Sequence, residues 1–116
     1  MSTNTKIYRV TSLLEFDQIK KGKFSRANSL WFKHVIVQNE SETPIKLSVA
    51  VSKKYGNAVA RNLFKRRIKN AIYSYGQTHE IPNNILLLIG VDRECSNQIE
   101  YCEIYNSIEF FFKKVI

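Results

Sequence analysis

The strongest chemical signal in the sequence is a stretch of positive charge without any carboxylate. No Asp or Glu occurs between Glu42 and Glu80, although eight Lys and Arg residues do, and seven of these fall between Lys53 and Lys69. Such a block has no local acid with which to pair, so its charge needs solvent or an external anion. Lys and Arg bind phosphate well, Arg through two parallel N–H donors and Lys as a mobile point charge. The stretch therefore predicts a surface for a polyanion.

A helix over residues 57–75 would order these charges. When the segment is placed on a wheel at about 100° per residue, its apolar centre contains Ala60, Phe64, Ile68, Ala71 and Tyr75. The polar arc clear of that centre contains Asn62, Lys65, Arg66 and Lys69. Arg61 and Arg67 lie at the two margins of the apolar face. Like charges four residues apart repel each other slightly, and a bound polyanion would reverse that cost.

The start of this helix is a second candidate for anion binding. Asn57 is a favourable N-cap, and the first N–H groups of a helix are unpaired and attract negative charge. Lys53 and Lys54 come just before the cap, and Arg61 lies one turn into the helix. We expect Lys53, Lys54, Asn57 and Arg61 to close around one phosphate.

Composition indicates a single small domain with an anionic partner. The chain has 116 residues, of which 44% are hydrophobic, so residues 1–116 are expected to form one domain, with residues 1–11 flexible. The net charge of +8 and the pI of about 9.6 favour nucleic acid first and an anionic membrane surface second. The longest apolar run, around residues 85–91, is too short to span a bilayer. The start of the chain has no signal-peptide stretch, so a cytoplasmic location is expected.

Catalysis by the protein's own side chains is not predicted. The chain has two Asp residues, Asp17 and Asp92, and the basic block has no acid at all, whereas a two-metal nuclease site needs clustered carboxylates. The two His residues are far apart in the sequence. Cys95 and Cys102 have no nearby His and are expected to be reduced thiols rather than metal ligands. We expect no catalytic residue, no metal site and no cofactor bound by the protein itself.

The first helix is predicted from its end signals. Ser12 and Glu15 form a capping box, in which the Ser hydroxyl accepts from the helix and the Glu reaches back to the cap. Gly22 is the expected stop. The apolar residues on one side are Leu13, Phe16 and Ile19.

The remaining elements follow from periodicity. Residues 30–38 and 45–52 are predicted strands joined by a polar turn, which suggests a hairpin with an additional kinked strand. The basic helix is expected to end at Gly76. Residues 85–89 predict a central strand buried on both faces, and residues 101–115 have a strong helical apolar face. The expected fold is α+β, a two-layer α/β sandwich with the order α-β-β-(β)-α-β-α.

Residues 52–66, SKKYGNAVARNLFKR, resemble the signature region of the bacterial ribonuclease P protein subunit. The family pattern has Ser-x-Lys, then Gly-Asn-Ala-Val, then Arg-Asn-Arg, and Lys-Arg after one further apolar residue. The matching residues are Lys53, Gly56, Asn57, Ala58, Val59, Arg61, Asn62, Lys65 and Arg66. Leu63 replaces the third Arg, so one RNA contact is expected to be lost there and partly replaced by Arg67. The similarity in plan extends over roughly residues 12–114.

The resemblance implies a role beside a catalytic RNA. In that family the RNA subunit holds the catalytic centre, and the protein docks on it and assists removal of the 5′ leader from precursor tRNA. The implied partners are the RNA subunit and precursor tRNA, with no membrane and no obligate protein partner, and Mg²⁺ is expected for the holoenzyme. The implied fold has a left-handed crossover between parallel strands, against the usual rule. The expected contacts with the RNA subunit are Lys53, Lys54, Asn57, Arg61, Asn62, Lys65, Arg66, Arg67 and Lys69.

A cleft between the first helix and the sheet accepts the single-stranded leader in that family. The positions carried over to this cleft are Phe16, Lys20, Phe24 and His34. Exposed aromatic rings stack unpaired bases, and Lys residues at the rim would follow phosphates. Two alternatives stay open: Phe16 as a core residue of an amphipathic helix, and His34 as an ordinary strand histidine.

Three other functions compete with this interpretation. A ribosomal-type RNA-binding protein would use the same basic helix for another structured RNA. A membrane-surface protein would use it for anionic lipid. A stand-alone nuclease would cleave RNA without an RNA subunit.

Overall fold

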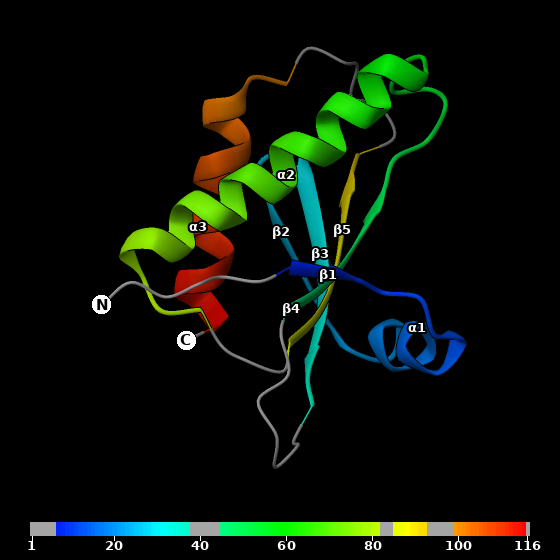
Figure 1. The fold of residues 1–116 in the computed structure, drawn as a ribbon, viewed down its shortest axis with the longest axis vertical. Coiled ribbons are helices and arrows are strands. Elements are labelled where there is room, and N and C mark those ends of the chain that lie inside the picture. Colours follow the sequence, from blue (N-terminus) through cyan, green and yellow to red (C-terminus); the bar gives the residue numbers. More distant parts are fainter. Residues whose placement is uncertain (1–6, 38–44, 82–84, 93–98, 116) are drawn as a thin grey trace.

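The computed structural model describes residues 7–37, 45–81, 85–92 and 99–115. Its elements are β1 (Ile7–Arg9), α1 (Leu13–Lys20), β2 (Lys23–Ala27), β3 (Leu30–Ile36), β4 (Ile45–Ala50), α2 (Ala58–Thr78), β5 (Ile85–Val91) and α3 (Tyr101–Val115). The strands form one sheet in the order β1-β4-β5-β3-β2. This is the expected α+β fold, with three helices around a mixed sheet (Figure 1).

The central position of β5 confirms the prediction from its apolar run. β5 pairs in parallel with β4 and antiparallel with β3. Six of its seven residues are buried, because helices contact both faces of the sheet at this strand. β4 and β5 are adjacent and parallel, and α2 makes the connection between them. The left-handedness of this crossover stays a prediction from the resemblance.

The predicted hairpin of residues 30–52 is wrong. β3 and β4 are separated by β5, and the partner of β3 in a hairpin is β2. A two-residue turn joins β2 to β3, and Asn28 in this turn has a φ of 55°, a left-handed conformation that Asn tolerates better than most residues. Alternation shows which side of a strand is buried but not which strand it pairs with. The additional strand is therefore β2, before the segment where we expected it.

The expectation that residues 1–11 are flexible is also corrected in part. Ile7–Arg9 form β1, which pairs in parallel with β4. Val10 is buried, and its N–H donates to the carbonyl oxygen of Leu47 at 3.2 Å. Three residues are too few for a periodic signal in the sequence. The strand forms because its residues pair with β4 at the edge of the sheet. Residues 1–6 lie outside the described part of the chain.

Helices lie on both faces of the sheet. α2 and α3 pack on each other and on one face, and α1 lies on the other (Figure 1). The main core joins α2 and α3 to the inward residues of β3, β4 and β5. Phe111 and Phe112 of α3 meet Phe32 of β3 and Leu87 of β5 in this core. A smaller cluster beneath α1 contains Val10, Ile19 and Leu86. The predicted two-layer sandwich corresponds to the sheet packed against α2 and α3. α1 covers part of the opposite face of the sheet.

Two details of α1 differ from the expectation. Ser12 caps α1 as predicted and accepts from Leu14 N at 3.1 Å, but the Glu15 carboxylate pairs with Lys46 Nζ on β4. Leu13 is 84% exposed and does not join the buried side of α1. α1 therefore attaches to the sheet through an ion pair as well as through its apolar side.

Gly76 does not end α2, which continues to Thr78. Gly76 is buried in the helix, and the cap is His79, whose N–H donates to the carbonyl oxygen of Tyr75 at 3.0 Å. The rings of His79 and Tyr75 stack with centroids 4.2 Å apart, and Tyr75 also stacks on Phe112 of α3. This packing on α3 holds the last turn, so tertiary contacts override the low helix propensity of glycine.

Candidate nucleic-acid interface

The start of α2 is held in place by two local contacts. Asn57 is the N-cap, and its side-chain oxygen accepts from Ala60 N at 2.9 Å, as the sequence predicted. The preceding turn is anchored by Tyr55, which is buried and packs against Phe64 with ring centroids 5.1 Å apart. The turn before the helix is therefore fixed relative to the helix. Tyr55 was not singled out from the sequence, although a Tyr between charged residues and a Gly is a recognisable anchor.

The two faces of α2 divide as the wheel predicted. Phe64, Ile68, Ala71, Ile72 and Tyr75 are buried in the main core. The exposed residues on the opposite side are Asn62, Lys65, Arg66 and Lys69, and Lys53, Lys54 and Asn57 are exposed just before the helix. We call these seven residues the basic helix surface.

The basic helix surface is not neutralised within the described residues. The ion pairs among the described residues join Arg26 to Asp92, Lys46 to Glu15 and Lys113 to Glu109, and none of them includes a residue of this surface. α2 contributes no acid to its own first turn. Its cations therefore face solvent without a carboxylate partner in this part of the chain, which is a favourable arrangement for a polyanion.

The two arginines at the margins of the core differ from the exposed cations. Arg67 donates from Nη1 to the carbonyl oxygen of Ile99 at 3.2 Å, so it ties α2 to the residues just before α3. Arg61 is half-buried, and its Nε is buried without a hydrogen-bond partner among the described residues. Leu63 is also half-buried. Arg67 therefore has a structural contact that its sequence position did not reveal.

A second surface lies on the face of the sheet opposite α2 and α3. Leu30 and Phe32 of β3 enter the main core, so the alternating residues Trp31 and Lys33 point to the other face. The register pairs Lys33 with Phe24 and Trp31 with Arg26 on β2. Phe24 and Arg26 are exposed, and Trp31 and Lys33 are half-buried. These four residues form what we call the open sheet face.

The aromatic residues of the open sheet face contact each other. Phe24 is 56% exposed and stacks on Trp31 with ring centroids 6.2 Å apart and planes 19° from parallel. Trp31 lies flat over Gly90 of β5, where an added Cβ would come within 2.1 Å of its ring. The glycine therefore lets the indole lie close to the sheet. The result is an aromatic pair flanked by Lys33 and Arg26.

Phe16 and Lys20 border this surface from α1. Phe16 is half-buried and packs with Val35 and Leu88 around the small cluster under α1, so it has one side in the core and the other toward solvent. Lys20 is exposed in the last turn of α1. Phe16, Lys20 and Phe24 thus lie on the same side of the sheet, as expected.

His34 does not lie on that side, and its predicted place in the cleft is wrong. It has the same alternation as Leu30 and Phe32, and its ring meets Phe111 of α3 edge-on, with centroids 5.2 Å apart. The strand residues that face the α1 side are Trp31 and Lys33. Sequence alternation could have shown this, because a polar residue in phase with Leu30 and Phe32 must share their face.

The contacts of His34 predict a dependence of stability on pH. Burial and, to a lesser extent, the nearby Lys23 lower the pKa of His34 below its ordinary value of 6.5. The unfolded chain therefore binds the proton more readily, and folding stability should be complete above about pH 7 and decline as the pH falls through 6.5. Urea unfolding of the chain and of the His34→Gln variant, measured at a series of pH values around 6.5, tests this pH dependence of stability. The decline should be smaller in His34→Gln, and equal declines would contradict the assignment.

Comparison with known proteins decides the family. The Ribonuclease P profile matches residues 5–116. The chain belongs to the ribonuclease P protein family. It is 32% identical over 108 residues to the ribonuclease P protein component of Clostridium kluyveri, covering 93% of this chain and 94% of that one. It is 33% identical over 109 residues to the component of Streptococcus pyogenes serotype M5, covering 93% and 86%. The family assignment agrees with the resemblance of residues 52–66.

Solved structures of the family have the same fold. The RNase P protein of Staphylococcus aureus superposes with a TM-score of 0.72 at 25% identity, covering 95% of each chain. The RNase P protein of Thermotoga maritima superposes with a TM-score of 0.74, covering 93% of this chain and 97% of that one, and at 18% identity it supports the fold alone. As an RNase P protein component, the chain acts in tRNA processing with an RNA partner.

Two kinds of feature are absent from the described residues. No helix in this part of the chain is both long and apolar enough to cross a bilayer. No group of three or more His, Cys, Asp and Glu side chains in it could hold a metal ion. Cys102 is a free, exposed thiol, and Cys95 lies outside the described residues.

Proposed function

We propose that this chain docks on the catalytic RNA of ribonuclease P through the basic helix surface and holds the 5′ leader of precursor tRNA on the open sheet face. The observation that carries the proposal is the exposed, acid-free stripe of α2 beside its capped N-terminus. Cations without local partners contribute most to the free energy of RNA binding, because their contacts with phosphates release condensed counterions. Arg61 and Arg67 stand at the margins and support the stripe.

The two surfaces adjoin at one end of the sheet. Ala50, the last residue of β4, pairs with Gly90, and Gly90 pairs with Trp31. The chain then passes through residues 51–57 into α2, so the turn with Lys53 and Lys54 follows directly from the edge of the open sheet face. An RNA subunit bound on α2 would therefore place its substrate near Trp31 and Phe24.

Aromatic rings would then bind the bases of the leader, and lysines would bind its phosphates. Phe24 and Trp31 present ring faces to unpaired bases, and base stacking tolerates any sequence because every base has a π-face. Lys33 and Lys20 would follow the phosphates. Phe16 would contribute its solvent side at the far border. This set keeps three of the four leader positions implied by the resemblance and replaces His34 with Trp31 and Lys33.

In this proposal the RNA carries out the cleavage and binds the Mg²⁺ that the holoenzyme needs, in the cytoplasm where precursor tRNA is made. The protein's contribution is to neutralise phosphates and to hold the substrate. Two carboxylates near the proposed surfaces, Glu15 and Asp92, are engaged in ion pairs with Lys46 and Arg26, which supports a binding role rather than a catalytic one.

Reconstitution tests the proposed function. Adding the purified chain to a bacterial ribonuclease P RNA at low Mg²⁺ should restore cleavage of the leader, since the protein's cations replace part of the metal ions that screen the RNA. The chain without RNA should cleave nothing, and cleavage by the protein alone would favour a nuclease. Absence of stimulation would overturn the proposal. Binding to anionic vesicles that survives RNA competition would favour a membrane-surface protein.

Leader recognition is tested by removing single rings. Trp31→Ala should weaken binding of leader-bearing precursor tRNA to the holoenzyme by about tenfold, since stacking on an aromatic ring contributes about 1–3 kcal/mol per base. Binding of mature tRNA should hardly change. Phe110→Ala, which removes an exposed aromatic ring from α3, is the control and should leave both affinities unchanged.

Phe16→Ala decides between its two roles. If Phe16 is a cleft residue, its replacement should lower affinity for the leader-bearing substrate more than affinity for mature tRNA. Equal loss for both substrates, together with a lower melting temperature, would make Phe16 a core residue only. Affinities by fluorescence anisotropy and unfolding by circular dichroism give the two readouts.

A further inference from the structure

The indole of Trp31 covers Gly90 on the face of the sheet opposite α2 and α3. The strand register places Trp31, Gly90 and Ala50 side by side in one row across β3, β5 and β4. Leu86 and Leu88 of β5 pack in the cluster under α1, so Gly90, two residues further along, has the same orientation. Gly90 is buried and Ala50 is exposed, which agrees with an indole that lies over β5 and not over β4.

A side chain at Gly90 would occupy the place of this indole. The three atoms nearest to a Cβ on Gly90 all belong to Trp31: Cζ2 at 2.1 Å, Cε2 at 2.2 Å and Nε1 at 2.7 Å. Cβ atoms in folded proteins essentially never come within 3.0 Å of such a neighbour, so even Ala at this position must displace the ring. The strand itself can stay in place, because none of the three atoms is a backbone atom. At Gly22, in contrast, the nearest neighbours are backbone atoms.

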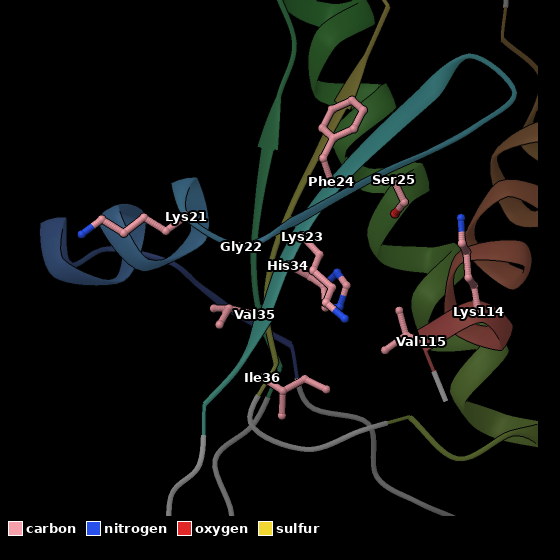
Figure 2. A pocket seen from close by; sticks show the side chains of 10 residues that line it. All are labelled: Lys21, Gly22, Lys23, Phe24, Ser25, His34, Val35, Ile36, Lys114 and Val115. Atoms are coloured by element: carbon pink, nitrogen blue, oxygen red, sulfur yellow. The ribbon is translucent and has the colours of Figure 1, made fainter.

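The position of the indole also determines how it meets Phe24. The centroids of the two rings are 6.2 Å apart, and their planes are 19° from parallel. Figure 2 shows the ring of Phe24 pointing away from Ser25 and His34, which lie on the side of the hairpin that faces α3. An indole displaced from Gly90 would therefore also lose its alignment with Phe24.

We propose that Gly90 is a positioning residue of the leader site, where its lack of a side chain lets Trp31 lie flat beside Phe24 as one aromatic platform. The inference rests on the proposed function of the open sheet face and adds to it a residue of β5 that touches no base. Gly90 acts through Trp31 alone. A base that stacks on a ring already held in place pays no ordering cost for that ring, so affinity depends on where the indole lies.

Fluorescence of the free chain tests the positioning without any RNA. Trp31 is the single Trp of the chain, so its emission reports the surroundings of this indole. In Gly90→Ala the emission should shift to longer wavelength and quenching by acrylamide should increase, because the ring moves from the sheet toward water. Val91→Ile adds a methylene to the next residue of β5, on the side of the main core. It is the matched control for overpacking and should leave the emission unchanged.

Affinity for precursor tRNA tests the role in binding. Gly90→Ala should weaken binding of the leader-bearing substrate to the holoenzyme by about tenfold, the same loss as expected for Trp31→Ala, and mature tRNA should bind as before. In the Trp31→Ala background, Gly90→Ala should cause no further loss, because the ring through which it acts is absent. A residue that only stabilised the sheet would lower the affinity by the same factor in both backgrounds.

The outcomes separate this inference from the proposed function. A shift of the emission, with a loss of affinity that vanishes in the Trp31→Ala background, supports the role of Gly90. Unchanged emission or unchanged leader affinity in Gly90→Ala, or an equal loss in both backgrounds, overturns it and leaves the leader site intact. If Trp31→Ala itself binds the leader-bearing substrate as tightly as the parent chain, the open sheet face is not the leader site and the role of Gly90 is overturned with it.

A folding control covers the case in which Gly90→Ala does not fold. The double variant with Trp31→Ala should then fold, because the ring that meets the added Cβ has been removed. Circular dichroism of both variants measures this rescue. A double variant that also fails to fold would show that the added Cβ conflicts with something other than Trp31, which would overturn the inference.

Discussion

Replacing Arg61 and Lys65 together by Ala is expected to weaken binding of the chain to ribonuclease P RNA by about 100-fold at moderate salt. Each charge-assisted contact with a phosphate contributes about 1.5 kcal/mol, and two such losses correspond to roughly two factors of ten. The slope of log affinity against log salt should fall by about 1.5, because two fewer counterions are released. Filter binding or anisotropy over a salt series measures both quantities.

The structure makes this pair informative because the two side chains differ in burial. Lys65 is exposed on the basic helix surface, whereas Arg61 is half-buried with its Nε unpaired among the described residues. Lys65→Ala alone should therefore change mainly the salt slope. Arg61→Ala should also disturb packing at the margin of the core, because it removes a half-buried side chain there.

Lys113→Ala is the control, since Lys113 lies on α3 rather than α2 and pairs there with Glu109. Its RNA affinity should stay within about twofold of the parent chain, as expected for a surface ion pair far from the interface. Unchanged affinity and slope in the double variant would remove α2 from the RNA interface. An equal loss in Lys113→Ala would show that net charge alone matters.

Gly22→Ala is expected to destabilise the fold by about 3 kcal/mol, comparable to severe overpacking of a core position. A Cβ at Gly22 would lie 2.2 Å from the carbonyl oxygen of His34 and 3.1 Å from that of Ile19. Both neighbours are backbone atoms in a strand and at a helix end, so they cannot turn away as a flexible side chain would. Denaturant unfolding measures the loss.

The position of Gly22 links this cost to function. Its N–H donates to Ile19 at 2.9 Å to end α1, and the next residue, Lys23, begins the pairing with β3. A shift there would move α1, with Phe16 and Lys20, relative to Phe24, so leader affinity should fall even where the chain remains folded. Lys21→Ala, at the exposed position just before, should change stability by less than about 0.5 kcal/mol. Similar stability of Gly22→Ala and the parent would contradict the close approach.

Much of the basic helix surface could be predicted because its determinants are local. The Asn57 cap, the buried line from Phe64 to Tyr75 and the exposed Lys65 and Lys69 all follow from spacings of three and four residues along one helix. The buried run of β5 is local in the same sense. The end of α2 was mispredicted because the contacts of Tyr75 with His79 and Phe112 outweigh Gly76.

The open sheet face could be predicted only in part. Phe16, Lys20 and Phe24 were carried over correctly to the α1 side, but His34 was not, because a shift of one residue along a strand exchanges the two faces of the sheet. Trp31 became a candidate only once its pairing with Gly90 and Arg26 was known.

The sequence by itself determined that this protein carries a basic helix without acidic residues and with a capped N-terminus, because charge, capping and periodicity are properties of neighbouring residues. Its motif at residues 52–66 also indicated the family that the comparisons establish. The tertiary structure alone decided that β2 rather than β4 forms the hairpin with β3, that β1 joins the sheet, and that Arg67 holds the start of α3. These depend on partners distant in the chain, and a pattern of alternation does not specify which partner a strand or side chain will meet.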